Sequence, residues 1–183
     1  MDPLPDFLTR YYTQGDDPFI SLNDLPIEQA QQVRREHCRK YGIGGFYGTE
    51  AYLIERKAIE EWIYNELIRK GGKPVTKTPV YMTLGASPKS EFDIRNDIQQ
   101  EAKEIVIPLR EIDMAAVSFT YPDSMYELTF DAQGKAFDGK RTNTPKVYLY
   151  HELLEIWSLY VKNIHYIEAQ VWNREMLAPF API

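Results

Sequence analysis

The sequence predicts a single α+β domain that spans residues 1–183, with a mostly antiparallel sheet of five or six strands packed by three to four helices. Three observations support this fold class. The chain of 183 residues has the usual length of one domain. Helical periodicity is concentrated early in the chain, and strand-like runs come late. The two patterns do not alternate regularly, as they would in a parallel βαβ sheet, so an antiparallel or mixed sheet is expected.

The first part of the chain is expected to hold one short strand and two helices. A strand is predicted near residues 7–12, within a segment interrupted by prolines and glycine. Asp24 is the expected N-cap of a helix that ends at Gly42, because apolar residues recur at helical spacing between them. Thr49 is the expected N-cap of the longest helix, over residues 50–70, which a pair of glycines terminates.

The rest of the chain is expected to be rich in strands. The elements predicted there are strands at 79–84, 105–107, 116–121, 126–131, 147–150 and 166–172, a helix or helical turn at 90–104, an exposed loop at 132–145 and a helix at 152–162. The side chains expected in the core are Ile59, Trp62, Ile63, Leu67, Phe119, Ile156, Trp157 and Val171.

Composition and charge exclude several classes of protein. The net charge of −6 disfavours general nucleic-acid binding, because an acidic surface repels phosphate backbones. The single cysteine, Cys38, rules out a disulfide within the chain and a cysteine-based zinc finger. Neither a signal-peptide pattern nor an apolar stretch of about 20 residues is present. A soluble, cytoplasmic protein that does not bind membranes is therefore expected.

Patterns that commonly mark a cofactor or a metal are incomplete. The glycine-rich loop at residues 42–48 leads into a helix, but it lacks the spacing of a dinucleotide-binding fingerprint and of a P-loop. The histidines His37, His151 and His165 show no spacing that would supply three ligands to one ion. No cofactor is evident, and no metal site is expected.

The densest group of polar and aromatic residues lies at positions 118–125. A predicted strand ends there in a turn, which is a common location for a ligand. The residues expected to bind a ligand are Ser118, Thr120, Tyr121, Asp123 and Ser124. No serine-hydrolase motif surrounds either serine. The first hypothesis is therefore a module that binds a small molecule or a protein partner without catalysis. The tyrosine content and the apolar C-terminal tail leave a homo-oligomer open.

A second hypothesis comes from three short motifs. Arg10, Ser118-x-Thr120 and Glu168-x-Gln170 occur in an order that resembles the arginine, serine and glutamate motifs of arginine-class ADP-ribosyltransferases. The resemblance implies that Arg10 and Ser118 position NAD and that Glu168 stabilises the reacting ribosyl cation. That family places its catalytic glutamate last in the final triplet, whereas here the glutamate comes first. The sequence leaves enzyme and binding module as alternatives.

Longer stretches are similar to a family of small bacterial proteins. They are Arg10-Tyr11-Tyr12, Lys70-Gly71-Gly72-Lys73-Pro74 and residues 118–125. The resemblance covers most of the chain, but no activity is assigned to that family, so it adds no function.

Overall fold

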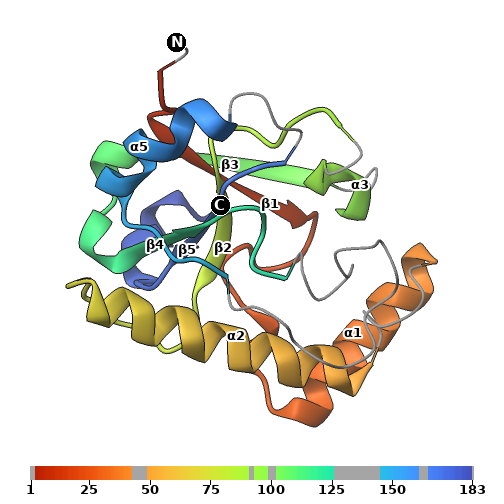
Figure 1. Ribbon diagram of the computed structural model, residues 1–183. Coiled ribbons are helices and arrows are strands. Elements are labelled where there is room, and N and C mark those ends of the chain that lie inside the picture. The colour runs from red at the N-terminus through yellow and green to blue at the C-terminus, as the bar shows by residue number, and fades with distance from the viewer. Residues whose placement is uncertain are drawn as a thin grey trace.

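The computed structural model describes residues 3–42, 49–90, 93–98, 102–125, 145–160 and 165–182. It confirms the α+β class, with one five-stranded antiparallel sheet and helices packed around it (Figure 1). The strands are β1 (Phe7–Thr13), β2 (Val80–Leu84), β3 (Ala102–Pro108), β4 (Val117–Thr120) and β5 (Glu168–Val171). Their order across the sheet is β3-β1-β2-β5-β4, which brings strands that are distant in sequence side by side.

Strand β1 parts from β2 after two residue pairs. With β3 it pairs along its whole length. With β2 it pairs only through Leu8–Leu84 and Thr9–Thr83. Figure 1 shows β1 running beside β3 while β2 takes another direction. Because β1 and β2 do not pair beyond Thr9, the backbone groups on their facing edges need other hydrogen-bond partners.

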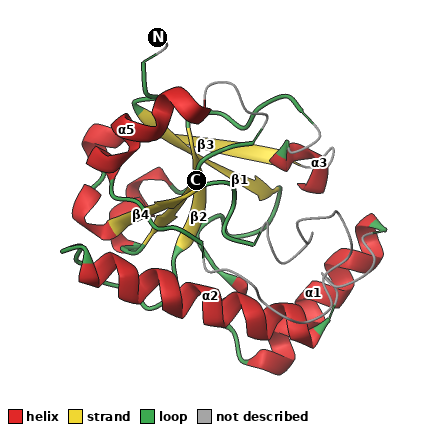
Figure 2. Ribbon diagram, in the orientation of Figure 1, coloured by secondary structure: helices red, strands yellow, loops and turns green. Residues whose placement is uncertain are grey.

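The two faces of the sheet differ in chemistry. One face is apolar; it includes Met82, Phe119 and Val171 and packs against α5 (Tyr150–Tyr160). The other face is polar, and α2 (Glu50–Arg69) lies on that side, opposite α5 (Figure 2). The buried polar side chains of the sheet are Thr9, Thr83, Ser118, Thr120 and Gln170. Four of them, Thr83, Ser118, Thr120 and Gln170, form hydrogen bonds within the protein, so this face holds a network of internal contacts. The Thr9 hydroxyl has no hydrogen-bond partner among the described residues.

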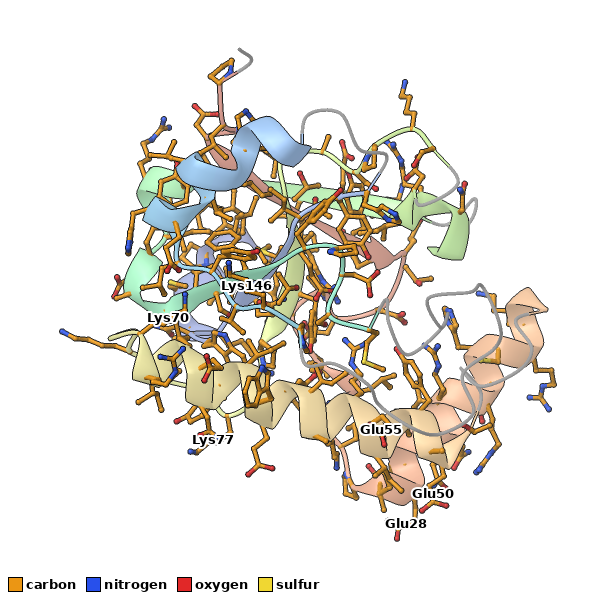
Figure 3. The ribbon with its side chains drawn as sticks, viewed as in Figure 1. Glu28, Glu50, Glu55, Lys70, Lys77 and Lys146 are labelled. Carbon is orange, nitrogen blue, oxygen red and sulfur yellow. The ribbon has the colours of Figure 1, made fainter. Side chains whose placement is uncertain are left out.

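Local sequence explains where α1 (Ile27–Tyr41) ends and where α2 begins. The Thr49 hydroxyl accepts a hydrogen bond of 3.3 Å from a backbone N–H in the first turn of α2, which confirms the predicted N-cap. Gly42 has a φ of 68° and ends α1, as predicted. Figure 3 labels Glu50 and Lys70 near opposite ends of α2, where their charges complement the helix dipole.

Two helix predictions are corrected. Asp24 is not the N-cap of α1, because it belongs to a preceding 3-10 turn and α1 begins after Pro26. Of the helix or helical turn predicted over residues 90–104, the described residues form α3 (Ile94–Ile98). The end of that region instead pairs with β1 as the start of β3. Pairing along the whole of β1 outweighs the local helical preference of these residues.

Two further predictions differ from the structure. The strand predicted at 147–150 is a single bridge between Tyr148 and Phe119, since α5 already begins at Tyr150. Trp62 is 36% exposed rather than buried, and its indole N–H donates to the Pro145 carbonyl oxygen at 3.2 Å. The predicted core side chains that are buried are Ile59, Ile63, Leu67, Phe119 and Val171, and Trp157 is partly buried.

Some sequence predictions concern residues that the structure does not describe. The strand at 126–131, most of the loops at 42–48 and 132–145, and the side chain of Ile156 lie outside the described residues. Within the described ranges, no helix combines the length and the apolar character needed to cross a membrane.

Candidate functional site

A pocket of about 160 Å³ lies where β1 and β2 separate. Its wall is built mainly by the strands β1, β2 and β5, with a contribution from α3. The lining residues are Thr9, Arg10, Tyr11, Tyr81, Met82, Ile94, Tyr166 and Glu168. The lining thus combines one cation and one carboxylate with three tyrosines, a combination that suits a small polar ligand with a ring.

Arg10 occupies the space between β1 and β2. Its Nε donates to the carbonyl oxygen of Pro18 at 2.6 Å, and its Nη1 donates to the carbonyl oxygen of Tyr81 at 3.0 Å. Burial, and after it the nearby Arg56, lower the pKa of Arg10 to about 10. At neutral pH the guanidinium is still protonated, so it places a fixed positive charge at the wall of the pocket.

Glu168 is held through one of its two carboxylate oxygens. Its Oε2 accepts hydrogen bonds from the backbone N–H of Ser124 at 3.0 Å, from Gln170 Nε2 at 2.9 Å and from Thr120 Oγ1 at 3.4 Å. Its Oε1 accepts no hydrogen bond from the part of the chain that the structure describes. The carboxylate is therefore fixed in orientation and has one oxygen left for a ligand.

Behind the pocket, Tyr81 joins the sheet to α2. Its hydroxyl donates to Glu60 Oε1 at 2.9 Å, and the Arg56 guanidinium lies over its ring, 4.3 Å from the centroid. Arg56 Nε is also 3.5 Å from Glu60 Oε1. Burial raises the pKa of Tyr81 well above its usual value, so the hydroxyl remains a donor. These contacts fix the tyrosine ring that forms one side of the pocket.

The burial of Glu60 predicts a pH-dependent stability. Burial raises the pKa of Glu60 above 4.5, so the folded protein binds this proton more tightly than the unfolded chain does. The resulting stabilisation is complete below pH 4.5 and is lost as the pH rises through the pKa of the folded state. The free energy of unfolding of the wild type, relative to that of Glu60→Gln, is therefore expected to fall between about pH 4 and pH 7. Urea denaturation at steps of about one pH unit measures this difference.

Glu61→Gln controls for the loss of one negative charge, because Glu61 lies on the exposed side of the same helix. The two proteins also differ if the pKa of Glu60 is unimportant, but their free energies of unfolding then differ by the same amount at every pH. Such a constant difference would contradict this prediction.

The structure brings together two of the three residues that suggested an ADP-ribosyltransferase. Arg10 and Glu168 line the same pocket, and Ser118 does not. The Ser118 side chain is buried; its Oγ donates to Gln170 Oε1 and accepts from Trp172 Nε1, each at 2.8 Å. In the structure Ser118 therefore contacts the network behind Glu168 rather than the pocket.

The segment predicted to bind a ligand has its side chains turned largely inward. Thr120 and Ser124 are buried, and Tyr121 is half-buried with its ring edge-on to His165, at a centroid distance of 6.3 Å. The Asp123 carboxylate accepts from the backbone N–H of Met125 at 2.9 Å, a contact typical of a turn. In the structure the segment supports Glu168 through Thr120 and Ser124.

Sequence reasoning missed Tyr81 and the α2 residues behind it. One signal was available: in β2, Val80 and Met82 alternate with Tyr81 and Thr83, so the two polar residues share one face. The partners Arg56 and Glu60 gave no local signal, since they look like the exposed charges of any helix. Among the described residues, no group of three histidine, cysteine, aspartate or glutamate side chains could hold a metal ion.

The fold and the site define an α+β domain with a small pocket between an arginine on one strand and a glutamate on another. Comparisons of the chain with protein families, with curated proteins and with solved structures find no match.

Proposed function

We propose that the pocket binds the nicotinamide end of NAD and that the protein transfers ADP-ribose to a small-molecule or protein acceptor. The observation that carries the proposal is the convergence of Arg10 and Glu168 on one pocket. These two residues were singled out by the resemblance of their motifs to those of arginine-class ADP-ribosyltransferases. They come from the first and the last strand of the chain, so only the folded protein brings them together.

The size of the pocket supports binding of a single ring. A cavity of about 150 Å³ is large enough for a benzene molecule, and this pocket measures about 160 Å³. Tyr11, Tyr81 and Tyr166 offer aromatic surface to such a ring. The ribose and the pyrophosphate of NAD would lie at the mouth of the pocket, beside Glu168 and Arg10, and the adenosine would lie outside it.

The charges of the pocket fit the steps of the reaction. When the glycosidic bond breaks, nicotinamide leaves with the bonding electrons and positive charge develops on the ribose. The acceptor then bonds to the same carbon and releases its proton to solvent. The Oε1 atom of Glu168 would stabilise that charge in the transition state. Arg10 Nη2, which donates no hydrogen bond within the described residues, would bind an anionic group of the dinucleotide.

The simpler alternative is a protein that binds a small molecule in this pocket without changing it. The same residues support that alternative, because an arginine, a carboxylate and three aromatic rings also make a binding site. A cytoplasmic location, which the sequence leads us to expect, is consistent with either function and with the single, buried Cys38.

The test is a thermal-shift titration of the wild-type protein with NAD, ADP-ribose and nicotinamide, followed by chromatographic measurement of nicotinamide release. At a hundred times its dissociation constant, a ligand adds about 2.7 kcal/mol of stability, which is about 5–10 °C in melting temperature. We expect a shift of this size with NAD, together with slow release of nicotinamide. A shift without release would support the binding-only alternative. No shift with any of the three compounds would overturn the transferase proposal and would direct the search for a bound molecule to other ligand classes.

A further inference from the structure

A chain of hydrogen bonds runs across the buried polar face and ends on Glu168. It starts at Trp172, whose Nε1 donates to Ser118 Oγ at 2.8 Å. Ser118 Oγ donates to Gln170 Oε1 at 2.8 Å. Gln170 Nε2 then donates to Glu168 Oε2 at 2.9 Å and to Thr120 Oγ1 at 3.0 Å. All five side chains come from β4, from β5 or from the residue that follows β5.

The directions of these bonds are set by the two ends of the chain. The indole N–H of Trp172 can only donate, and the Glu168 carboxylate can only accept. The Gln170 amide therefore turns its NH₂ group to Glu168 and its oxygen to Ser118, whose hydroxyl accepts from Trp172 and donates to that oxygen. With its oxygen and both of its N–H groups engaged, the side chain cannot rotate without losing bonds in a buried site.

We infer that Gln170, oriented by Ser118 and Trp172, is a positioning residue that holds Glu168 Oε2 and thereby presents Oε1 to the pocket. The inference rests on the proposed function, in which Oε1 is the atom that acts on the ribose. It gives Ser118 a role that differs from the one implied by the resemblance: Ser118 orients the amide that holds the glutamate, and it does not contact NAD.

The identity of residue 170 fits this role. A glutamine both donates to the Glu168 carboxylate and accepts from Ser118, which no charged or apolar side chain of the same length can do. A glutamate at position 170 would place a second carboxylate beside the first and repel it. Thus a Glu-x-Gln pair on one face of β5 combines a reacting carboxylate with the donor that fixes it.

The experiment compares Gln170→Leu with Thr83→Val. Thr83 is the matched control, because it is buried on the same face and is the cross-strand neighbour of Glu168, but its hydroxyl donates to the carbonyl oxygens of Thr9 and Gly85 and makes no hydrogen bond to Glu168. Gln170→Leu is expected to lower kcat for nicotinamide release about tenfold to a hundredfold, as misplacement of a reacting group does. KM for NAD is expected to stay within about threefold of wild type. Thr83→Val is expected to lower the melting temperature and leave kcat unchanged.

A second variant and a second measurement keep the inference testable if Gln170→Leu folds poorly or if NAD is not turned over. Ser118→Ala frees the Gln170 amide to rotate and is expected to give a smaller loss of kcat. Crystal structures are expected to show a single orientation of the Glu168 carboxylate in the wild type and in Thr83→Val. In Gln170→Leu the carboxylate is expected to be rotated or to occupy two alternative orientations. An unmoved carboxylate, or a kcat loss no greater than that of Thr83→Val, would overturn the inference. Absence of turnover by the wild type would instead overturn the proposed function, and the crystal structures would still decide the role of Gln170.

Discussion

Replacing Glu168 by glutamine is expected to slow nicotinamide release from NAD by about a hundredfold to a thousandfold. The substitution keeps the shape of the side chain and one oxygen that can accept from the Ser124 backbone N–H and from Gln170 Nε2. It removes the negative charge that would stabilise the ribosyl cation in the transition state. Because this charge acts mainly on the transition state, kcat is expected to fall while the affinity for NAD remains close to that of the wild type.

The measurement needs both rate and affinity. Nicotinamide release can be followed by chromatography, and NAD affinity by isothermal titration calorimetry. Glu175→Gln is the control, because Glu175 is an exposed glutamate outside the pocket, in a C-terminal 3-10 helix (Glu175–Phe180). Turnover by Glu168→Gln within about threefold of the wild type would rule out a catalytic role for Glu168. Joint loss of NAD binding and of several degrees in melting temperature would show that the residue is needed for the fold instead.

Trp172→Ala is expected to lower the free energy of unfolding by about 3–5 kcal/mol. Trp172 has no exposed surface and belongs to the core under α2, where its ring packs edge-on against Tyr64 at 5.5 Å between centroids. Its removal would leave a cavity and would also take away the donor that orients Ser118. In a domain of this size the loss corresponds to about 6–20 °C in melting temperature.

Trp62→Ala is the matched control, since Trp62 lies on α2 and is 36% exposed. Its only hydrogen bond in the described part of the chain goes to the Pro145 carbonyl oxygen. Trp62→Ala is expected to lower the free energy of unfolding by no more than about 1 kcal/mol. Urea denaturation of both variants, followed by circular dichroism, measures the two values. Equal destabilisation by the two substitutions would contradict the assignment of Trp172 to the core and of Trp62 to the surface.

Local signals in the sequence predicted much of the fold. The helix cap at Thr49 and the left-handed stop at Gly42 depend on contacts within a few residues, so they could be read directly. The strand at β2 could also be read from its alternating pattern and flanking residues. The start of β3 could not be read in this way, because its residues have a local preference for helix. They form a strand because they pair with β1, which is hydrogen-bonded to β3 along its full length.

The candidate site was predicted only in part. Arg10 and Glu168 were singled out by their motifs, and both line the pocket. Tyr81 was not, because a tyrosine in a strand has the same pattern whether it packs in a core or lines a pocket. Ser118 was expected to bind a ligand; its burial could not be foreseen, since it depends on Trp172 and Gln170, which are distant in sequence.

By itself the sequence determined the fold class, most of the helices and strands, and two residues of the site, Arg10 and Glu168. These follow from periodicity and capping, which act over a few residues. Only the tertiary structure decided which strands became neighbours, that β1 would part from β2 after Thr9, and that Arg10 and Glu168 would face one pocket. The physical reason is that strand pairing and the burial of a polar face depend on contacts between distant segments, for which a local pattern carries no signal.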